Sequence, residues 1–159
     1  MCYTLYSSKQ AAYKPLQRRK RGQKMFKNPK HATTNFKMLL PFIKEAEKHD
    51  GYLKCKSAGF MDLVVEKLYY EDVFNNPVFS ISHYGVQNGD AMADPDVTYS
   101  VNFETGTVIP LSFRNDYMGI EQEVFRGDMY SRKLMTELDD FLWHWLQTID
   151  EQGFKPVQA

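Results

Sequence analysis

Three aspartates and a histidine in one polar stretch are the first candidates for chemistry in this chain. Asp90, Asp94 and Asp96 lie in HYGVQNGDAMADPD, residues 83–96, which begins at His83. Carboxylates beside an imidazole suit a hard divalent cation such as Mg²⁺ or Mn²⁺. The spacing matches no EF-hand loop, and Asn-Gly-Asp and Asp-Pro-Asp are typical of turns whose side chains bond backbone amides. The sequence favours turn chemistry here and keeps a metal-dependent hydrolase as the alternative.

A second polar stretch, RNDYMGIEQEV at residues 114–124, carries an arginine and two glutamates. The planar guanidinium of Arg114 can bind a carboxylate or a phosphate, although an ion pair with Asp116 or Glu121 is the simpler interpretation. Glu121 and Glu123 are two residues apart on a predicted strand, which places their backbones roughly 6.5–7 Å apart on one face. Either glutamate can serve as general base in the hydrolase alternative.

Other single residues are weaker candidates. His83 continues the inward face of its strand, so we expect a buried, hydrogen-bonded histidine rather than a ligand or a base. Trp143 lies off the apolar stripe of the last helix, where an exposed tryptophan would indicate a partner interface, whereas Trp145 on the stripe is expected in the core. The chain has no P-loop, GxGxxG, HExxH or nucleophile elbow, so we assign no catalytic residue and expect no cofactor.

Charge is strongly segregated along the chain. The first 44 residues hold eleven Lys or Arg and no Asp or Glu, so residues 45–159 hold nine bases and all twenty acids. The densest basic cluster is Arg18, Arg19, Lys20 and Arg21. We expect residues 1–32 to form a flexible basic arm that contacts nucleic acid or an acidic protein. A solubilising tail without a role is the alternative interpretation.

The acidic remainder suggests two further hypotheses. The arm of one chain can lie on the acidic body of another, which would give a salt-sensitive homo-oligomer. The acidic body can also mimic nucleic acid and inhibit a DNA-binding enzyme. The order of hypotheses is therefore a non-enzymatic interaction module first, the hydrolase second and the acidic mimic third.

Composition indicates a cytoplasmic location. Cys2 and Cys55 are too few for a disulfide scaffold, and the N-terminus has no apolar core of a secretory signal. The longest helix-like apolar run, residues 38–43, is far shorter than the ~20 residues that span a bilayer. We expect no membrane association.

Periodicity predicts the elements that must position these residues. A helix capped by Thr33-Thr34-Asn35 runs to Gly51. Pro41 inside this span indicates a kink, or a regular helix that begins at Pro41. A second, strongly amphipathic helix follows Ser131. Between them we predict a loop at 85–96, a hairpin turning at Glu104-Thr105-Gly106, and strands at 52–57, 60–70, 78–84, 97–103, 107–113 and 119–125. The pattern predicts a single α+β domain over residues 33–159. In it a twisted, mainly antiparallel sheet of five or six strands is flanked by an N-terminal and a C-terminal helix packed on one face.

Residues 51–154 also resemble a known family. The phrases GYLKCKSAGFMDLVVEKL, NGDAMADPD, RNDYMGIEQ and FLWHWLQTIDEQGF are similar to those of small uncharacterised bacterial domains encoded on plasmids, phages and conjugative elements. The resemblance implies a bacterial cytoplasmic accessory protein with no assigned activity. It implies no catalytic residues.

Overall fold

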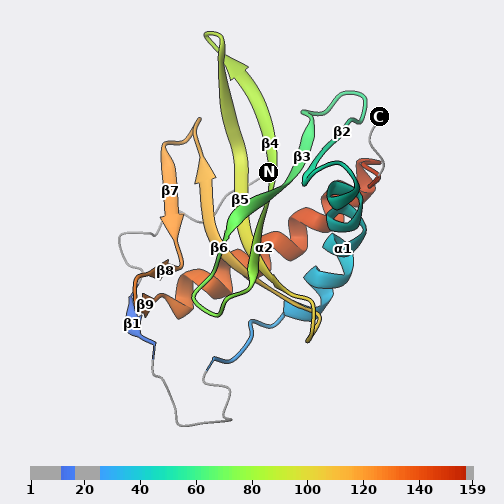
Figure 1. Cartoon of the computed structure of the whole chain (residues 1–159). Coiled ribbons are helices and arrows are strands. Elements are labelled where there is room, and N and C mark those ends of the chain that lie inside the picture. The colour runs from blue at the N-terminus through green and yellow to red at the C-terminus, as the bar shows by residue number, and fades with distance from the viewer. Residues whose placement is uncertain (1–11, 17–25, 157–159) are drawn as a thin grey trace.

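The structure, a computed structural model, describes residues 12–16 and 26–156. Within these residues a six-stranded antiparallel sheet and a three-stranded sheet accompany two helices. Both helices lie against the same face of the six-stranded sheet (Figure 1). The predicted α+β class, the antiparallel sheet and the two flanking helices are therefore confirmed.

The elements follow the chain in this order: β1 (Lys14–Pro15), α1 (Ala32–Lys48), β2 (Tyr52–Cys55), β3 (Leu63–Glu71), β4 (Pro77–Gln87), β5 (Asp90–Asn102), β6 (Thr107–Asn115), β7 (Ile120–Glu123), β8 (Phe125–Arg126), β9 (Met129–Tyr130) and α2 (Arg132–Glu151). The large sheet is a meander in the order β2-β3-β4-β5-β6-β7, so each strand pairs with its neighbour in sequence. The small sheet has the order β1-β9-β8.

The predicted loop at 85–96 is wrong, because this stretch is the far end of a long hairpin. Strands β4 and β5 stay paired up to Gln87 and Asp90, and only Asn88 and Gly89 form the turn, with φ angles of 52° and 83°. Two consecutive residues with positive φ are what a two-residue hairpin turn needs, and Asn-Gly supplies them at low cost. Asp94 and Asp96 are therefore strand residues.

The hairpin of β5 and β6 has the predicted alternation. Val97, Tyr99 and Val101 are fully buried, and Gly106 takes the left-handed φ of 69° expected in the connection. Pro110 stands opposite Tyr99 next to a register shift, a position in the ladder that tolerates a residue without a backbone N–H. The predicted strand 97–103 ends one residue early, because Phe103 lies beyond the end of β5 and is 46% exposed.

Helix α1 begins earlier than predicted. Its N-cap is His31 rather than a residue of Thr33-Thr34-Asn35, and no side chain of the cap residue bonds the first turn. The helix continues through Pro41 to Lys48, and Gly51 follows with a φ of 81°. The early start has a tertiary cause, a contact of His31 with α2 described below.

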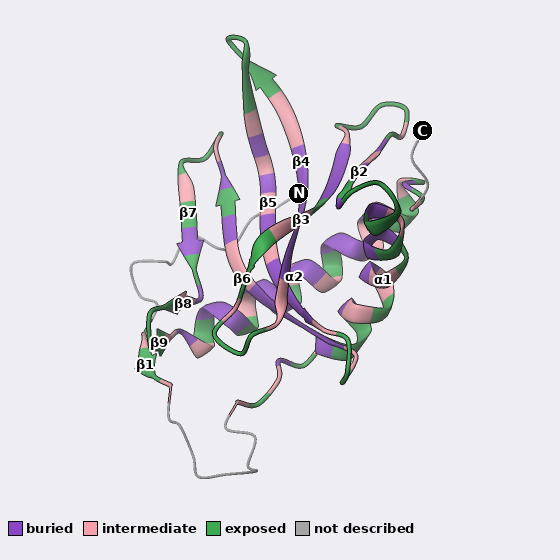
Figure 2. Ribbon diagram, in the orientation of Figure 1, coloured by how far each residue is buried: buried purple, intermediate pink, exposed green. Residues whose placement is uncertain are grey.

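Helix α2 carries the largest apolar face, as predicted. The Ser131 hydroxyl accepts a hydrogen bond from the Leu134 N–H at 3.2 Å, which confirms the cap. Its buried apolar residues are Leu134, Met135, Leu138, Leu142, Trp145, Leu146 and Ile149. Figure 2 shows this buried face turned towards the middle of the sheet. Each large side chain buried there contributes about 1.5–3 kcal/mol, so α2 and the sheet hold each other in place.

The small sheet joins part of the N-terminal stretch to the domain. Strand β1 pairs with β9, and residues 26–31 lead into α1. The boundary between an arm and a domain at residue 32 stays a prediction. In the part of the chain that the structure describes, no helix has the length and the apolar character to cross a membrane.

Candidate functional site

His83 is a buried core histidine, as expected. Its side of β4 faces the helices, and its ring lies 5.5 Å from that of Trp145 and 5.4 Å from that of Phe154, centroid to centroid. One ring nitrogen, Nδ1, is 3.1 Å from the carbonyl oxygen of Asp62. Burial lowers the pKa of His83, which favours the neutral imidazole.

The three aspartates of the predicted metal set diverge. Asp96 pairs with Ser82 and so lies on the helix-free face of the sheet, opposite to His83. Its carboxylate accepts a hydrogen bond from the Tyr84 hydroxyl at 3.2 Å, and burial raises its pKa. Asp94 accepts from the side-chain amide of Asn115 at 2.8 Å, and Asp90 is exposed beside the hairpin turn. Within residues 12–16 and 26–156, these aspartates and His83 do not form a group with metal-ligand geometry.

Arg114 takes part in ion pairs on the same helix-free face. Its Nε lies 3.3 Å from Asp116, as the ion-pair interpretation predicted, and its terminal nitrogen lies 3.8 Å from Asp96. Glu121 stands opposite Arg114 in the register of β6 and β7, and both it and Glu123 are exposed. Since half-exposed pairs of this kind contribute about 0–1 kcal/mol, they stabilise the strand ends only weakly.

The four basic residues predicted to bind a partner, Arg18, Arg19, Lys20 and Arg21, lie outside the described residues. The chain on both sides of them is described. Before them, the Leu16 N–H donates to the Asp128 carbonyl at 2.7 Å. After them, Phe26 packs against the rings of Phe74, Phe125 and Tyr130.

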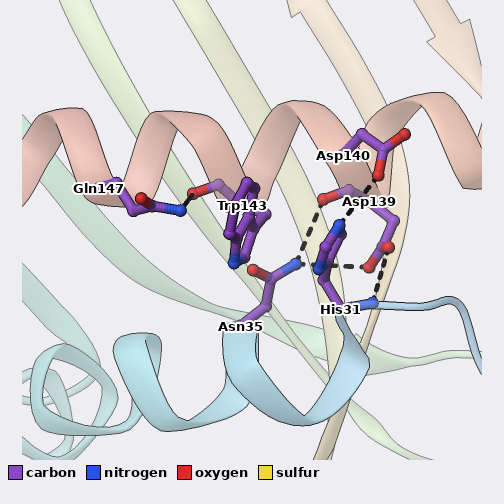
Figure 3. Close-up of polar contacts among 6 residues, drawn as sticks. All are labelled: His31, Asn35, Asp139, Asp140, Trp143 and Gln147. Atoms are coloured by element: carbon purple, nitrogen blue, oxygen red, sulfur yellow. Dashed lines mark hydrogen bonds and ion pairs between the residues drawn. The ribbon is translucent and has the colours of Figure 1, made fainter.

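A polar cluster that the sequence analysis did not identify lies where α1 begins against α2. His31 approaches two consecutive aspartates of α2 (Figure 3). The backbone N–H of His31 donates to Asp139 at 2.9 Å, and its ring Nε2 lies 3.0 Å from Asp140. Each of His31, Asp139 and Asp140 offers one potential metal-ligand atom, and these three atoms lie within 4.8 Å of one another. Among the residues that the structure describes, this is the group that could hold a metal ion.

Two further side chains complete the cluster. Asn35 is fully buried, and its Nδ2 donates to the carbonyl and to the carboxylate of Asp139, both at 3.4 Å, while its Oδ1 has no partner. Trp143 stacks on the His31 ring at 4.6 Å with an interplanar angle of 10°. Trp143 is thus half-buried beneath a residue of its own chain, whereas Trp145 is in the core as predicted.

Asp139 is the electrostatic centre of this cluster. Its side chain caps the N-terminus of α1 from another helix, where the helix dipole favours negative charge. Burial nevertheless raises the pKa of Asp139, and its hydrogen bond from His31 only partly opposes this. The negative charge of the buried Asp139 carboxylate, with that of Asp140 beside it, is therefore not fully compensated by its neighbours, and a cation placed here would stabilise it.

Comparisons with known proteins identify a family and add no activity. No curated protein and no solved structure matches the chain significantly. A family model described as a domain of unknown function, DUF6908, matches residues 34–155. This range includes the whole six-stranded sheet, all of α2, and α1 apart from its first two residues. The predicted resemblance to an uncharacterised domain is confirmed at that level, and the chain belongs to the DUF6908 family.

Proposed function

We propose that this protein is a non-enzymatic interaction module of the cytoplasm that binds the phosphate backbone of nucleic acid. The contact is made by the basic segment, which we define as residues 17–24, QRRKRGQK. The observation that carries the proposal is the charge segregation, with every Asp and Glu of the chain after residue 44. Such a distribution concentrates the positive potential at one end of the chain, where it attracts a polyanion.

The described residues around the basic segment support this choice of surface. Both ends of the segment join the domain near β8 and β9, through Leu16 on one side and Phe26 on the other. Cationic residues lie on the segments that adjoin these two points, and we call them the basic corner: Lys14, Lys27, Arg126, Arg132 and Lys133. The Arg126 guanidinium lies 4.4 Å above the Tyr13 ring, and Arg132 donates to the carbonyl of Lys27.

The N-terminus of α2 adds to the positive charge of the basic corner, as its position beside β9 shows (Figure 1). The first turn of α2 has no acidic residue and begins with Arg132 and Lys133. Cations at a helix N-terminus oppose the helix dipole and cost roughly 0.3–1 kcal/mol each. Phosphate groups close to this turn would offset that cost, since helix N-termini and cations both favour anions.

An acidic protein surface is the competing partner, and a second copy of this chain would present one. Two acidic residues, Glu123 and Asp128, lie beside the basic corner, and their backbone carbonyls accept from the Tyr13 hydroxyl and the Leu16 N–H. No observation favours the hydrolase alternative, because His83 and Asp96 lie on opposite faces of the sheet. The acidic mimic likewise has no specific observation in its favour.

Fluorescence anisotropy with a labelled duplex oligonucleotide tests the proposal. The full chain is compared with a variant in which Arg18, Arg19, Lys20 and Arg21 are all changed to Gln. The matched control changes four lysines remote from the basic corner to Gln: Lys37, Lys44, Lys48 and Lys56. The affinity should fall steeply between about 50 and 200 mM salt, and the basic-segment variant should lower the log–log salt slope by about 3–4, at about 0.9 per lost phosphate contact.

The outcomes separate the partners. Equal binding by the basic-segment variant and the wild type refutes the role of the segment. Binding of poly-glutamate without binding of the duplex refutes the nucleic-acid proposal in favour of an acidic protein partner. Salt-sensitive self-association in sedimentation, lost in the basic-segment variant, would identify the second copy as the partner.

A further inference from the structure

The cluster between α1 and α2 has the composition of a metal site. It brings one imidazole and two carboxylates together, with a buried amide beside them (Figure 3). We propose that His31, Asp139 and Asp140 bind one divalent transition-metal ion, that Zn²⁺ fits them best, and that the Asn35 amide oxygen completes the site. This proposal is independent of the binding of nucleic acid.

The distances are close to those of a ligand set. Two ligands of one tetrahedral Zn²⁺, each about 2.0–2.1 Å from the ion, lie roughly 3.3 Å apart. His31 Nε2 and the Asp140 carboxylate are already 3.0 Å apart. The third ligand atom, from Asp139, lies within 4.8 Å of both. Because the terminal torsion of Asp is soft, a small rotation brings this carboxylate into the coordination sphere.

The buried side-chain amide of Asn35 also indicates a cation at this place. Its side chain reaches Asp139 from α1, is fully buried, and leaves Oδ1 without a partner. Its two Nδ2 contacts to Asp139 are long, at 3.4 Å. A half-turn of the amide would place the oxygen against the carboxylate, which is unfavourable for two acceptors unless a cation lies between them. A bound ion would supply the partner that the Asn35 oxygen lacks.

The negative charge of the two carboxylates also favours a bound cation. Asp139 is fully buried, whereas the Asp140 side chain is 54% exposed, so an ion can enter from the Asp140 side and meet a carboxylate that lacks full compensation. The neighbouring Arg132 lowers the pKa of Asp139 only slightly, so it supplies little of the positive charge that would compensate this carboxylate. A divalent cation would neutralise both carboxylates of the cluster.

The donor set selects the kind of metal. An imidazole nitrogen combined with carboxylate oxygens suits Zn²⁺ and its neighbours in the first transition row. Mg²⁺ prefers oxygen ligands and keeps several waters, so it should bind much more weakly. Since His31 lies at the start of α1 and both aspartates are on α2, the ion would fasten the two helices together at this point.

Calorimetric titration of the metal-free full chain with ZnCl₂ near neutral pH tests the proposal. We expect one Zn²⁺ per chain and at least a tenfold loss of affinity in Asp140→Asn and in His31→Gln. Asp140 is exposed, so its variant should keep the fold, which circular dichroism checks. The matched control is His49→Gln, because His49 and Glu45 form an exposed pair at 3.3 Å that could bind zinc adventitiously. This variant should leave the affinity unchanged.

A spectroscopic readout locates the ion. Co²⁺ bound at His31 should quench the emission of Trp143, which stacks on that ring. Trp143→Phe should remove this quenching. The absence of Zn²⁺ binding to the metal-free chain, an affinity unchanged in both Asp140→Asn and His31→Gln, or a loss caused by His49→Gln would each overturn the proposal.

Discussion

Replacement of Asp139 tests most directly how hydrogen bonds and buried charge hold α1 against α2. Its carboxylate accepts from the His31 N–H at 2.9 Å and from the Asn35 amide at 3.4 Å. Asp139→Asn keeps a neutral oxygen at this position, whereas Asp139→Leu has a similar size and removes every acceptor of the side chain. Comparing the two variants separates the hydrogen bonds from the charge.

The expected magnitudes follow from burial. In Asp139→Leu, the His31 N–H and the Asn35 amide lose an acceptor in a buried site, and each loss costs about 1–3 kcal/mol. Both variants are neutral, so relief of the buried charge cancels between them. Asn35 also keeps its contact with the Asp139 backbone carbonyl in both variants, so the unpaired His31 N–H dominates and we expect Asp139→Leu to be less stable than Asp139→Asn by about 2 kcal/mol. Asp139→Asn itself should differ from the wild type by less than about 1 kcal/mol at neutral pH.

The pH dependence gives a second test on the same variants. Burial raises the pKa of Asp139 in the folded state above its ordinary value of 3.8, so the folded chain holds this proton at a pH where the unfolded chain has released it. The stability contributed by the protonated group is complete below the ordinary pKa and is lost as the pH rises through the folded pKa. The stability of the wild type relative to Asp139→Asn should therefore decrease as the pH rises above about 3.8.

Urea unfolding followed by circular dichroism measures both effects, with a chelator present so that no metal contributes. The partly exposed pair between Asp140 and the His31 ring serves as control. Asp140→Asn should lower the free energy of unfolding by no more than about 1 kcal/mol. Equal stabilities of Asp139→Leu and Asp139→Asn would refute the hydrogen-bond reasoning. A difference between wild type and Asp139→Asn that does not change with pH would refute the raised pKa.

Three further substitutions test other parts of the fold. Ser131→Ala removes the hydroxyl that caps α2 and should lower the free energy of unfolding by about 1 kcal/mol in urea titrations. Gly85→Ala places a methyl group against the Tyr117 hydroxyl. Because this end of an exposed side chain can move, the free energy of unfolding from thermal denaturation should change by less than about 1 kcal/mol, while the Tyr117 NMR resonances shift. Asp96→Asn removes a carboxylate whose pKa burial raises, so the stability of the wild type relative to this variant should fall as the pH rises above 3.8, as measured by urea unfolding at several pH values.

The elements that the sequence predicted well are those whose signals are local. The β5–β6 hairpin follows from strict alternation around Tyr99 and from a glycine in the connection, and α2 follows from a cap and an apolar stripe around Trp145. Each signal lies within about twenty residues, and the buried partners of each element only reinforce it. Local pattern and tertiary packing agree in these elements, which is why they could be predicted.

The end of the β4–β5 hairpin shows how composition can mislead. Asp90, Asp94 and Asp96 suggested a loop, because aspartate is disfavoured in strands. The polar side chains are accommodated in the ladder because Asp96 faces away from the helices and Asp94 bonds Asn115 on the neighbouring strand. The Asn-Gly turn was the better local signal, since it predicts strand on both sides.

The His31 cluster had no local signal. His31 and Asp139 are 108 positions apart, and only the packing of α1 on α2 brings them together. The pair Asp139-Asp140 beside the apolar stripe of α2 was the available hint, because a carboxylate on the buried side of a helix needs a partner. The same contact explains the start of α1, where a side chain of α2 replaces the local cap expected from Thr33 or Thr34.

The contacts of the N-terminal residues also decide how the basic segment has to be tested. Residues 12–16 add β1 to the small sheet, Phe26 packs among three aromatic rings, and His31 bonds two side chains of α2. Deleting residues 1–32 would therefore remove a strand, an aromatic contact and the cap of α1 together with the charges, and would expose Phe125 and Tyr130. A loss of binding after such a deletion would not distinguish a lost phosphate contact from a damaged domain. Neutralising Arg18, Arg19, Lys20 and Arg21 keeps the chain on both sides intact, so a change in the salt slope can be assigned to charge.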